Sequence, residues 1–130
     1  MAVEELKRDP MMAHLLASLE KGRDIGHYGR LAFVLVARHF LSEDEVLDYL
    51  MKDRDVDEHK ARSLLAQVNA RQYNPPKRER ILDWMSKQKF AICPDPANPD
   101  QCNVYKNLDF PKEVYDRIQD FYESRTETHT

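Results

Sequence analysis

Apolar residues recur at helical spacing along most of the chain, and the breaks between these repeats divide it into predicted helices. Apolar positions three and four residues apart form the buried stripe of an amphipathic helix. The predicted helices span residues 10–21, 31–40, 43–51, 57–72 and 76–87, with a last helix from Pro111. No stretch has the alternation of a strand. The sequence therefore predicts an all-α fold, a single compact bundle of five to six helices in one domain covering residues 1–130.

Polar residues mark the starts of three of these helices. Asp9 precedes Pro10, and proline is favoured at the first position of a helix. Ser42 and Glu45 have the spacing of a capping box, in which each side chain accepts a backbone N–H of the first turn. Asp57 can cap the helix that follows it. These signals predict helix starts near residues 10, 43 and 58.

The segment before the most apolar helix is rich in glycine. All three glycines of the chain lie within eight residues, at Gly22, Gly26 and Gly29. Glycine allows a tight turn or a close approach of the backbone. The following residues 31–37 are apolar on every side, which is typical of a central helix packed by its neighbours.

His27, Tyr28 and Arg30 lie where this turn leads into the central helix. The start of a helix carries unpaired N–H groups that favour an anion such as phosphate, and Arg30 would add a forked donor. Arg38 lies two helical turns beyond Arg30, on a similar face, so a phosphate-facing stripe is one interpretation. The alternative is a structural turn in which Arg30 pairs with a carboxylate and His27 caps a backbone group.

A second basic segment, residues 71–80, joins two predicted helices. Its charge is +3, and Tyr73 could stack on a nucleobase. The candidate nucleic-acid-binding residues here are Arg71, Tyr73, Lys77, Arg78 and Arg80. The alternative is a proline-broken joint between helices whose basic side chains pair with nearby acids.

Residues 89–110 are rich in proline and hold both cysteines of the chain. They show no helical periodicity, so we expect one long ordered but irregular loop, and loops of this length tend to be functional. Cys93 and Cys102 are too few for a complete zinc or iron-sulfur site, which needs about four ligands. Buried thiols, a disulfide or a partial metal site remain open.

Composition limits the classes of function. The net charge is −3 and the pI is about 5.9, so any nucleic-acid binding must come from a local patch. No apolar run is long enough to span a membrane and the first residues are charged, so we expect a cytoplasmic protein without membrane contact. Residues 1–8 and 125–130 are expected to be flexible. No phosphate loop, nucleophile elbow or zinc helix is present, so we expect no enzyme.

The motifs together resemble a known family. The run His27-Tyr28-Gly29-Arg30-Leu31-Ala32-Phe33, followed by Leu41-Ser42-Glu43-Asp44-Glu45, is similar to the C-terminal helical domain of the archaeal and eukaryotic DNA primase large subunit. That family carries an H-x-G-R-[LM]-x-[FY] signature and then a similar helix start. Tyr73-Asn74-Pro75 looks like its Tyr-x-Pro element and Cys93-Pro94 like its Cys-Pro loop. The motifs occur in the same order over residues 11–105.

This resemblance implies a non-catalytic helper of primer synthesis. Such a module grips the template and the 5′ triphosphate of the initiating nucleotide, and His27 and Arg30 match the family's triphosphate-contacting His and Arg. The implied partners are single-stranded DNA or a primer-template, and a catalytic primase or polymerase chain. The family holds a four-iron cluster through four cysteines, whereas Met11 and Arg78 stand near two of those positions here. We therefore expect no cofactor. The competing interpretation is a helical adaptor that docks a partner protein without binding nucleic acid.

Overall fold

Helices form all the regular structure of residues 2–95 and 97–118, which are the part of the chain that the computed structural model describes. The all-α prediction is therefore confirmed. The longer helices are α2 (Pro10–Glu20), α3 (Gly26–Ala37), α4 (Glu43–Leu50), α5 (Glu58–Arg71) and α6 (Arg78–Met85). None of the helices in these described residues is both long and apolar enough to cross a membrane.

Shorter helices appear where the sequence had no clear periodicity. They are α1 (Ala2–Leu6), the 3₁₀ helix η1 (Pro99–Cys102) and α7 (Val104–Asn107). The last helix, predicted from Pro111, is confirmed over residues 112–118. The prediction of an irregular loop over residues 89–110 is thus wrong for η1 and α7, which are too short to show a repeat. Leu6 in α1 is fully buried. The flexibility of residues 1–8 stays a prediction, and residues 125–130 lie outside the described residues.

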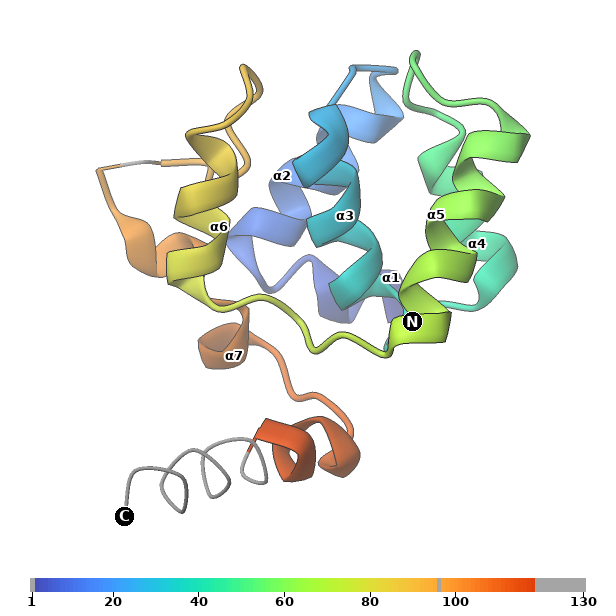
Figure 1. Cartoon of the computed structure of the whole chain (residues 1–130). Helices are drawn as coiled ribbons and strands as arrows, with labels where there is room; N and C mark the ends of the chain where they lie inside the picture. Colours follow the sequence, from blue (N-terminus) through green and yellow to red (C-terminus); the bar gives the residue numbers. More distant parts are fainter. Residues whose placement is uncertain (1, 96, 119–130) are drawn as a thin grey trace.

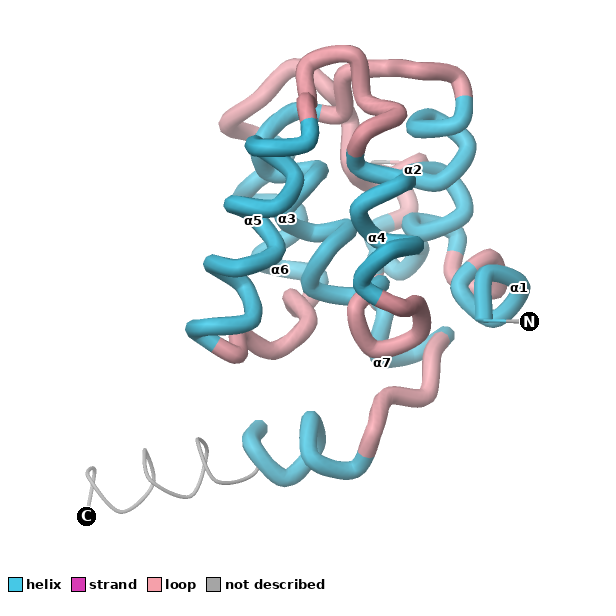
Figure 2. Tube along the Cα trace, turned by 90° about the vertical axis from the view of Figure 1, so that its right-hand side faces the viewer, coloured by secondary structure: helices cyan, strands magenta, loops and turns pink. Residues whose placement is uncertain are grey.

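Helix α3 is the centre of the bundle. It packs against α2, α4, α5 and α6, and Figure 1 shows α2 and α6 on one side of it and α4 and α5 on the other. The 90° view shows α4 and α5 side by side (Figure 2). The segment after α7 packs on the lower end of the bundle, where Phe110 and Val114 are buried. Residues 32–37 of α3 are all buried, as their uniform apolarity predicted.

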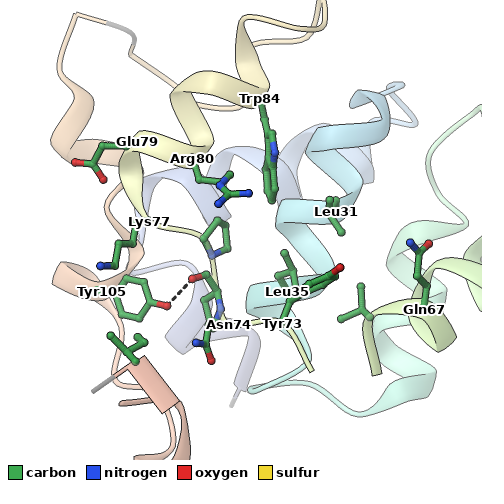
Figure 3. A pocket seen from close by; sticks show the side chains of 14 residues that line it. Leu31, Leu35, Gln67, Tyr73, Asn74, Lys77, Glu79, Arg80, Trp84 and Tyr105 are labelled. Atoms are coloured by element: carbon green, nitrogen blue, oxygen red, sulfur yellow. Dashed lines mark hydrogen bonds between the residues drawn. The ribbon is translucent and has the colours of Figure 1, made fainter. Parts of the chain in front are cut away.

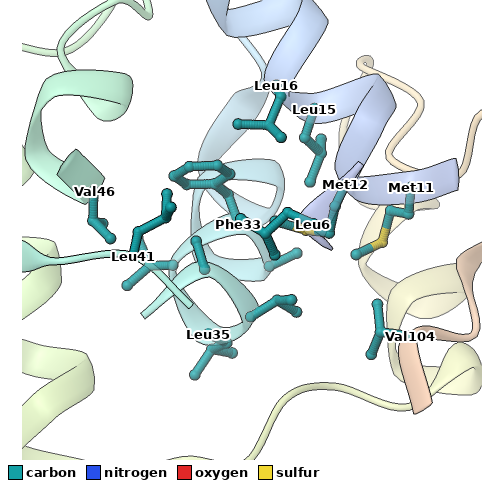
Figure 4. Packing of buried hydrophobic residues seen from close by; sticks show 14 of the residues in the cluster. Leu6, Met11, Met12, Leu15, Leu16, Phe33, Leu35, Leu41, Val46 and Val104 are labelled. Carbon is teal, nitrogen blue, oxygen red and sulfur yellow. The ribbon is translucent and has the colours of Figure 1, made fainter. Parts of the chain in front are cut away.

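The core gathers around the Phe33 ring. Figure 4 shows Leu15 and Leu16 of α2 beside this ring, with Leu41 and Val46 approaching from the start of α4. All five side chains are at most 6% exposed. Full burial of a side chain of this size stabilises the fold by about 1.5–3 kcal/mol, so packing around α3 is a main contribution to stability.

The predicted helix starts are confirmed by their hydrogen bonds. Asp9 Oδ2 accepts the Met12 N–H at 2.9 Å, and Asp57 Oδ1 accepts the Lys60 N–H at 2.8 Å. Ser42 forms the expected capping box before α4. Each such cap satisfies a backbone donor that the helix itself cannot pair, which is worth about 1 kcal/mol.

Two boundaries differ from the sequence prediction. Helix α3 begins at Gly26 rather than near residue 31. Gly29 lies inside the helix and packs closely on the Ile25 side chain, since a Cβ at Gly29 would come within 3.2 Å of Ile25 Cβ. Helix α3 also ends at Ala37, and residues 38–40 form a turn before the cap of α4. The polar residues 26–30 are therefore part of the central helix.

Candidate nucleic-acid interface

Arg30 is held in a buried ion-pair network. Its side chain is 7% exposed, and its Nη1 lies 3.1 Å from Asp24 Oδ1 and 3.2 Å from Asp53 Oδ2. Its Nη2 lies 3.8 Å from Asp55 Oδ2. A phosphate group at this position would meet three carboxylates. The structure therefore shows the alternative in which Arg30 pairs with carboxylates, and it corrects the prediction that this guanidinium faces a phosphate.

Asp53 organises this network from the charged connector, residues 52–56, which lies between the predicted helices 43–51 and 57–72. Its carboxylate is buried, and Oδ2 also accepts the Ile25 N–H at 3.0 Å. Oδ1 accepts the Asp55 N–H at 2.8 Å. A buried carboxylate with an opposite charge and backbone donors around it is well compensated. Asp53 thus fixes the connector after α4 to the turn before α3.

Gln88 closes the start of α3 from the end of α6. Its Oε1 accepts the Tyr28 N–H at 2.9 Å, and its Nε2 donates to Ile25 O at 2.9 Å and to Phe90 O at 3.1 Å. Gly26 allows this approach, since a Cβ there would come within 2.5 Å of Gln88 Oε1. The Gly26 N–H is also paired, with Asp24 Oδ1 at 2.9 Å, so two N–H groups of the expected anion site are already occupied.

The two other residues predicted in this turn lie on its outer side. His27 is exposed, and its ring packs edge-on against Tyr28 with 5.2 Å between centroids. Tyr28 is half-buried, and its ring stacks on Trp84 of α6 at 5.8 Å and 25°. Tyr28 therefore has a packing role, while His27 is the predicted turn residue that solvent reaches most easily.

A groove of about 800 Å³ lies between α3, α6 and the linker that joins α5 to α6. Leu31 and Leu35 of α3 line its floor, and Trp84 and Tyr73 stand at its sides (Figure 3). The Tyr105 hydroxyl donates to Pro75 O and holds the linker in place. Clefts of this size with aromatic walls are the usual form of ligand sites.

The basic segment 71–80 lines and borders this groove, as the binding prediction needs. Arg71, Lys77 and Arg80 are exposed, and Tyr73 is 46% exposed. Lys77 and Arg80 line the groove directly. Arg78 differs, because it pairs with Asp100 at 2.7 Å and with Glu79 at 3.2 Å. For Arg78 the structure shows the alternative of a basic residue paired with nearby acids.

Arg38 belongs to a cluster of two guanidinium groups and one imidazole, formed by Arg38, His39 and Arg117, which contacts the groove through the linker residues Tyr73 and Asn74. Arg38 Nη2 donates to Tyr73 O at 3.0 Å, and Arg117 Nε donates to Asn74 Oδ1 at 2.9 Å. Arg38 lies eight residues, or roughly 12 Å, along the helix from Arg30, so the two guanidinium groups do not share a site. The predicted stripe from Arg30 to Arg38 is therefore not one surface.

Three nitrogen atoms of this cluster are buried without a hydrogen-bond partner: Arg38 Nε, His39 Nε2 and Arg117 Nη2. Burial and the neighbouring Arg117 lower the pKa of Arg38. Burial and the two guanidinium groups lower the pKa of His39 to about 4, so this imidazole is neutral at pH 7. Unfilled donors beside two adjacent cations favour the approach of an anion.

Cys93 and Cys102 lie together in the fold, and both are fully buried. No disulfide joins them. Burial and the adjacent Cys93 thiol raise the pKa of Cys102 to about 12, so it stays a thiol at neutral pH. In the described part of the chain no three His, Cys, Asp or Glu side chains are grouped to hold a metal ion. Two cysteines in the whole chain do not fit the four-thiolate site of a four-iron cluster.

Sequence reasoning missed Asp53, Gln88 and Arg117. Asp53 stands among several acids of a charged connector, and nothing in its neighbours marks it as buried. Gln88 acts through contacts with residues about 60 positions away. Arg117 lies in the last helix, which carries no motif. Only a long-range signal, such as paired substitutions among related chains, could have found these residues.

One comparison with known proteins gives a significant match. Over 77 residues, or 55% of this chain, the sequence is 31% identical to the DNA primase large subunit PriL of Thermoplasma acidophilum. The chain spans only 23% of that relative's length. No family model matches the chain, and no solved structure matches it. The similarity agrees in kind with the motif resemblance and suggests the primase large subunit family.

Proposed function

We propose that this protein is a non-catalytic, nucleic-acid-binding accessory module of primer synthesis. It binds single-stranded template DNA or a primer-template and contacts the 5′ triphosphate of the initiating nucleotide. The similarity to a primase large subunit supports the role. The observation that carries the binding is the aromatic groove bordered by the exposed cations of segment 71–80 and by the cluster of Arg38, His39 and Arg117.

The phosphate contacts are assigned from exposure and pairing. Arg38 is the first candidate, because its buried Nε has no hydrogen-bond partner and Arg117 stands beside it. Arg71, Lys77 and Arg80 are exposed along the linker and can follow the sugar-phosphate chain. His27 remains a candidate for the 5′ triphosphate. Arg30 instead maintains the turn that presents His27.

A partner chain would supply the chemistry. The relative is named as a large subunit, and nucleotidyl transfer requires metal ions held by carboxylates. No group of three or more His, Cys, Asp or Glu side chains that could hold a metal ion is found among residues 2–95 and 97–118. The proposed partner is therefore a catalytic primase or polymerase chain.

A helical adaptor is the second candidate function. The floor of the groove is apolar, formed by Leu31, Leu35 and Val68, and could receive the apolar face of a partner's helix. Salt distinguishes the two functions. A single strand neutralised by about four cations gives a slope of about −3 in log affinity against log salt, whereas an apolar interface is almost indifferent to salt.

The test is titration of the full chain with plain and 5′-triphosphate oligonucleotides at two salt concentrations, for the native protein and for Arg38→Gln. Arg38→Gln removes a charged hydrogen bond, so we expect binding of both strands to weaken about tenfold or more. The matched control is Arg62→Gln on the exposed face of α5, where the arginine pairs with Glu58. It should change affinity less than about twofold.

Three results would contradict the proposal. Affinity that does not fall with salt, or no binding of either oligonucleotide, would show that the protein does not contact phosphates and would favour the adaptor. Equal losses in the Arg38 and Arg62 variants would show that the cluster beside the groove is not the phosphate contact.

A further inference from the structure

The Trp84 ring forms a flat wall of the groove. The residue comes from α6 and is half-buried. Figure 3 shows its ring between Arg80 and Leu31, with Leu35 and Tyr73 across the groove. The groove has a volume of about 800 Å³, which is several times the volume of a single nucleobase. The groove is therefore large enough to admit a planar ring beside Trp84.

This wall is fixed from behind. Tyr28 stacks on Trp84 at 5.8 Å with 25° between the ring planes. The Gln88 side chain holds the end of α6 against the start of α3 through hydrogen bonds to Tyr28 N–H and Ile25 O. An aromatic surface that is already immobilised loses little entropy when a ligand stacks on it.

The charges around the groove suit a nucleic-acid strand better than an apolar peptide. Arg80 is exposed at the rim beside Trp84. The Arg38 and Arg117 guanidinium groups contact the groove residues Tyr73 and Asn74 and keep unfilled buried donors. Glu79 also lines the groove, but it pairs with Arg78. Stacking aromatics beside cations that follow a backbone are the common features of single-strand binding sites.

We propose that this groove seats one unpaired nucleobase of a single strand, with Trp84 as the stacking surface and the adjacent phosphate on Arg38 and Arg117. The inference rests on the proposed function and specifies which part of the strand enters the fold. Each base stacked on an aromatic side chain typically contributes a factor of about 5 to 100 in affinity. Recognition by stacking tolerates every base, so the groove holds the strand without reading its sequence.

The chain contains a single tryptophan, so its fluorescence reports on this wall alone. The full-length protein is titrated with a single-stranded DNA of mixed sequence and with an abasic strand of the same length and charge. We expect the DNA to quench Trp84 emission and the abasic strand to bind without quenching. By anisotropy of labelled DNA, Trp84→Leu should bind about 5- to 100-fold more weakly. Trp84→Phe, which keeps a stacking ring, should stay within a few-fold of the native protein.

Four results would overturn the inference. If both strands bind and neither or both quench Trp84, the base does not enter the groove, although the proposed function survives. If Trp84 emission changes with protein concentration alone, a second copy of the chain occupies the groove. If neither strand binds at low salt, the proposed function fails and this inference fails with it. A Trp84→Phe variant that loses as much affinity as Trp84→Leu would also contradict a stacking role.

Discussion

Replacing Asp53 with alanine should destabilise the fold more than replacing Asp24, the exposed carboxylate of the same ion-pair network around Arg30. Asp53 is 1% exposed and holds both Arg30 and the Ile25 N–H. Removing one partner of a buried ion pair typically costs about 3–5 kcal/mol, because the remaining charge is left uncompensated. Asp24 still lies 3.1 Å from Arg30, but its side chain is 40% exposed and offsets little of that cost.

The assay is urea unfolding followed by circular dichroism. With a slope of about 2 kcal/mol per molar, a loss of about 3–5 kcal/mol lowers the unfolding midpoint by about 1.5–2.5 M. The control is Asp24→Ala, which removes the exposed partner of the same guanidinium and should cost about 0–1 kcal/mol. Asp53→Asn keeps the shape and is measured if the alanine variant does not fold. Equal losses for Asp24→Ala and the Asp53 variants would refute the argument from burial.

Two further predictions concern the turn before α3 and the acid side of the stability curve. Gly26→Ala should cost about 2–4 kcal/mol in urea unfolding, because φ is +78° and the new Cβ would clash with Gln88. Gly22→Ala, at φ +70° and with only an ordinary contact to Lys52 O, should cost about 1–2 kcal/mol. Similar losses would contradict the role of the close approach. His39 has its folded pKa lowered to about 4 from 6.5, so the unfolded chain takes up the proton first and stability falls as pH decreases from about 6.5 to 4. Unfolding midpoints are measured across that pH range. His39→Gln should reduce the loss of stability on acidification, whereas the control His59→Gln, at an exposed position, should not. Equal pH profiles for the two variants would show that His39 is not the titrating group.

Local signals predicted much of the fold, because they act within a few residues. The caps at Asp9, Ser42 and Asp57 each join a side chain to a backbone N–H three residues away, and all three appear in the structure. The uniform apolarity of residues 31–37 correctly indicated a buried central helix. The short helices η1 and α7 span about one turn each, which leaves no periodicity to detect.

The candidate site was harder to predict, because whether a cation is free to bind phosphate depends on partners that lie far away in the chain. Arg30 stands in a glycine turn that suits an anion, but the deciding partner, Asp53, lies 23 residues further on. The cations of segment 71–80 were visible as a local run, and most of them remain exposed in the structure. Arg117 gave no signal, since it joins Arg38 only after the segment following α7 returns to the linker.

The Gln88 amide couples the movement of the Trp84 side of the groove to the start of α3. This one side chain binds the backbone of Ile25 and Tyr28 at the start of α3 and of Phe90 after α6, so the end of α6 that carries Trp84 cannot move outward unless these hydrogen bonds break. The Tyr28 N–H therefore reports on the opening of these hydrogen bonds. The rate at which it exchanges its proton with solvent measures how often they open.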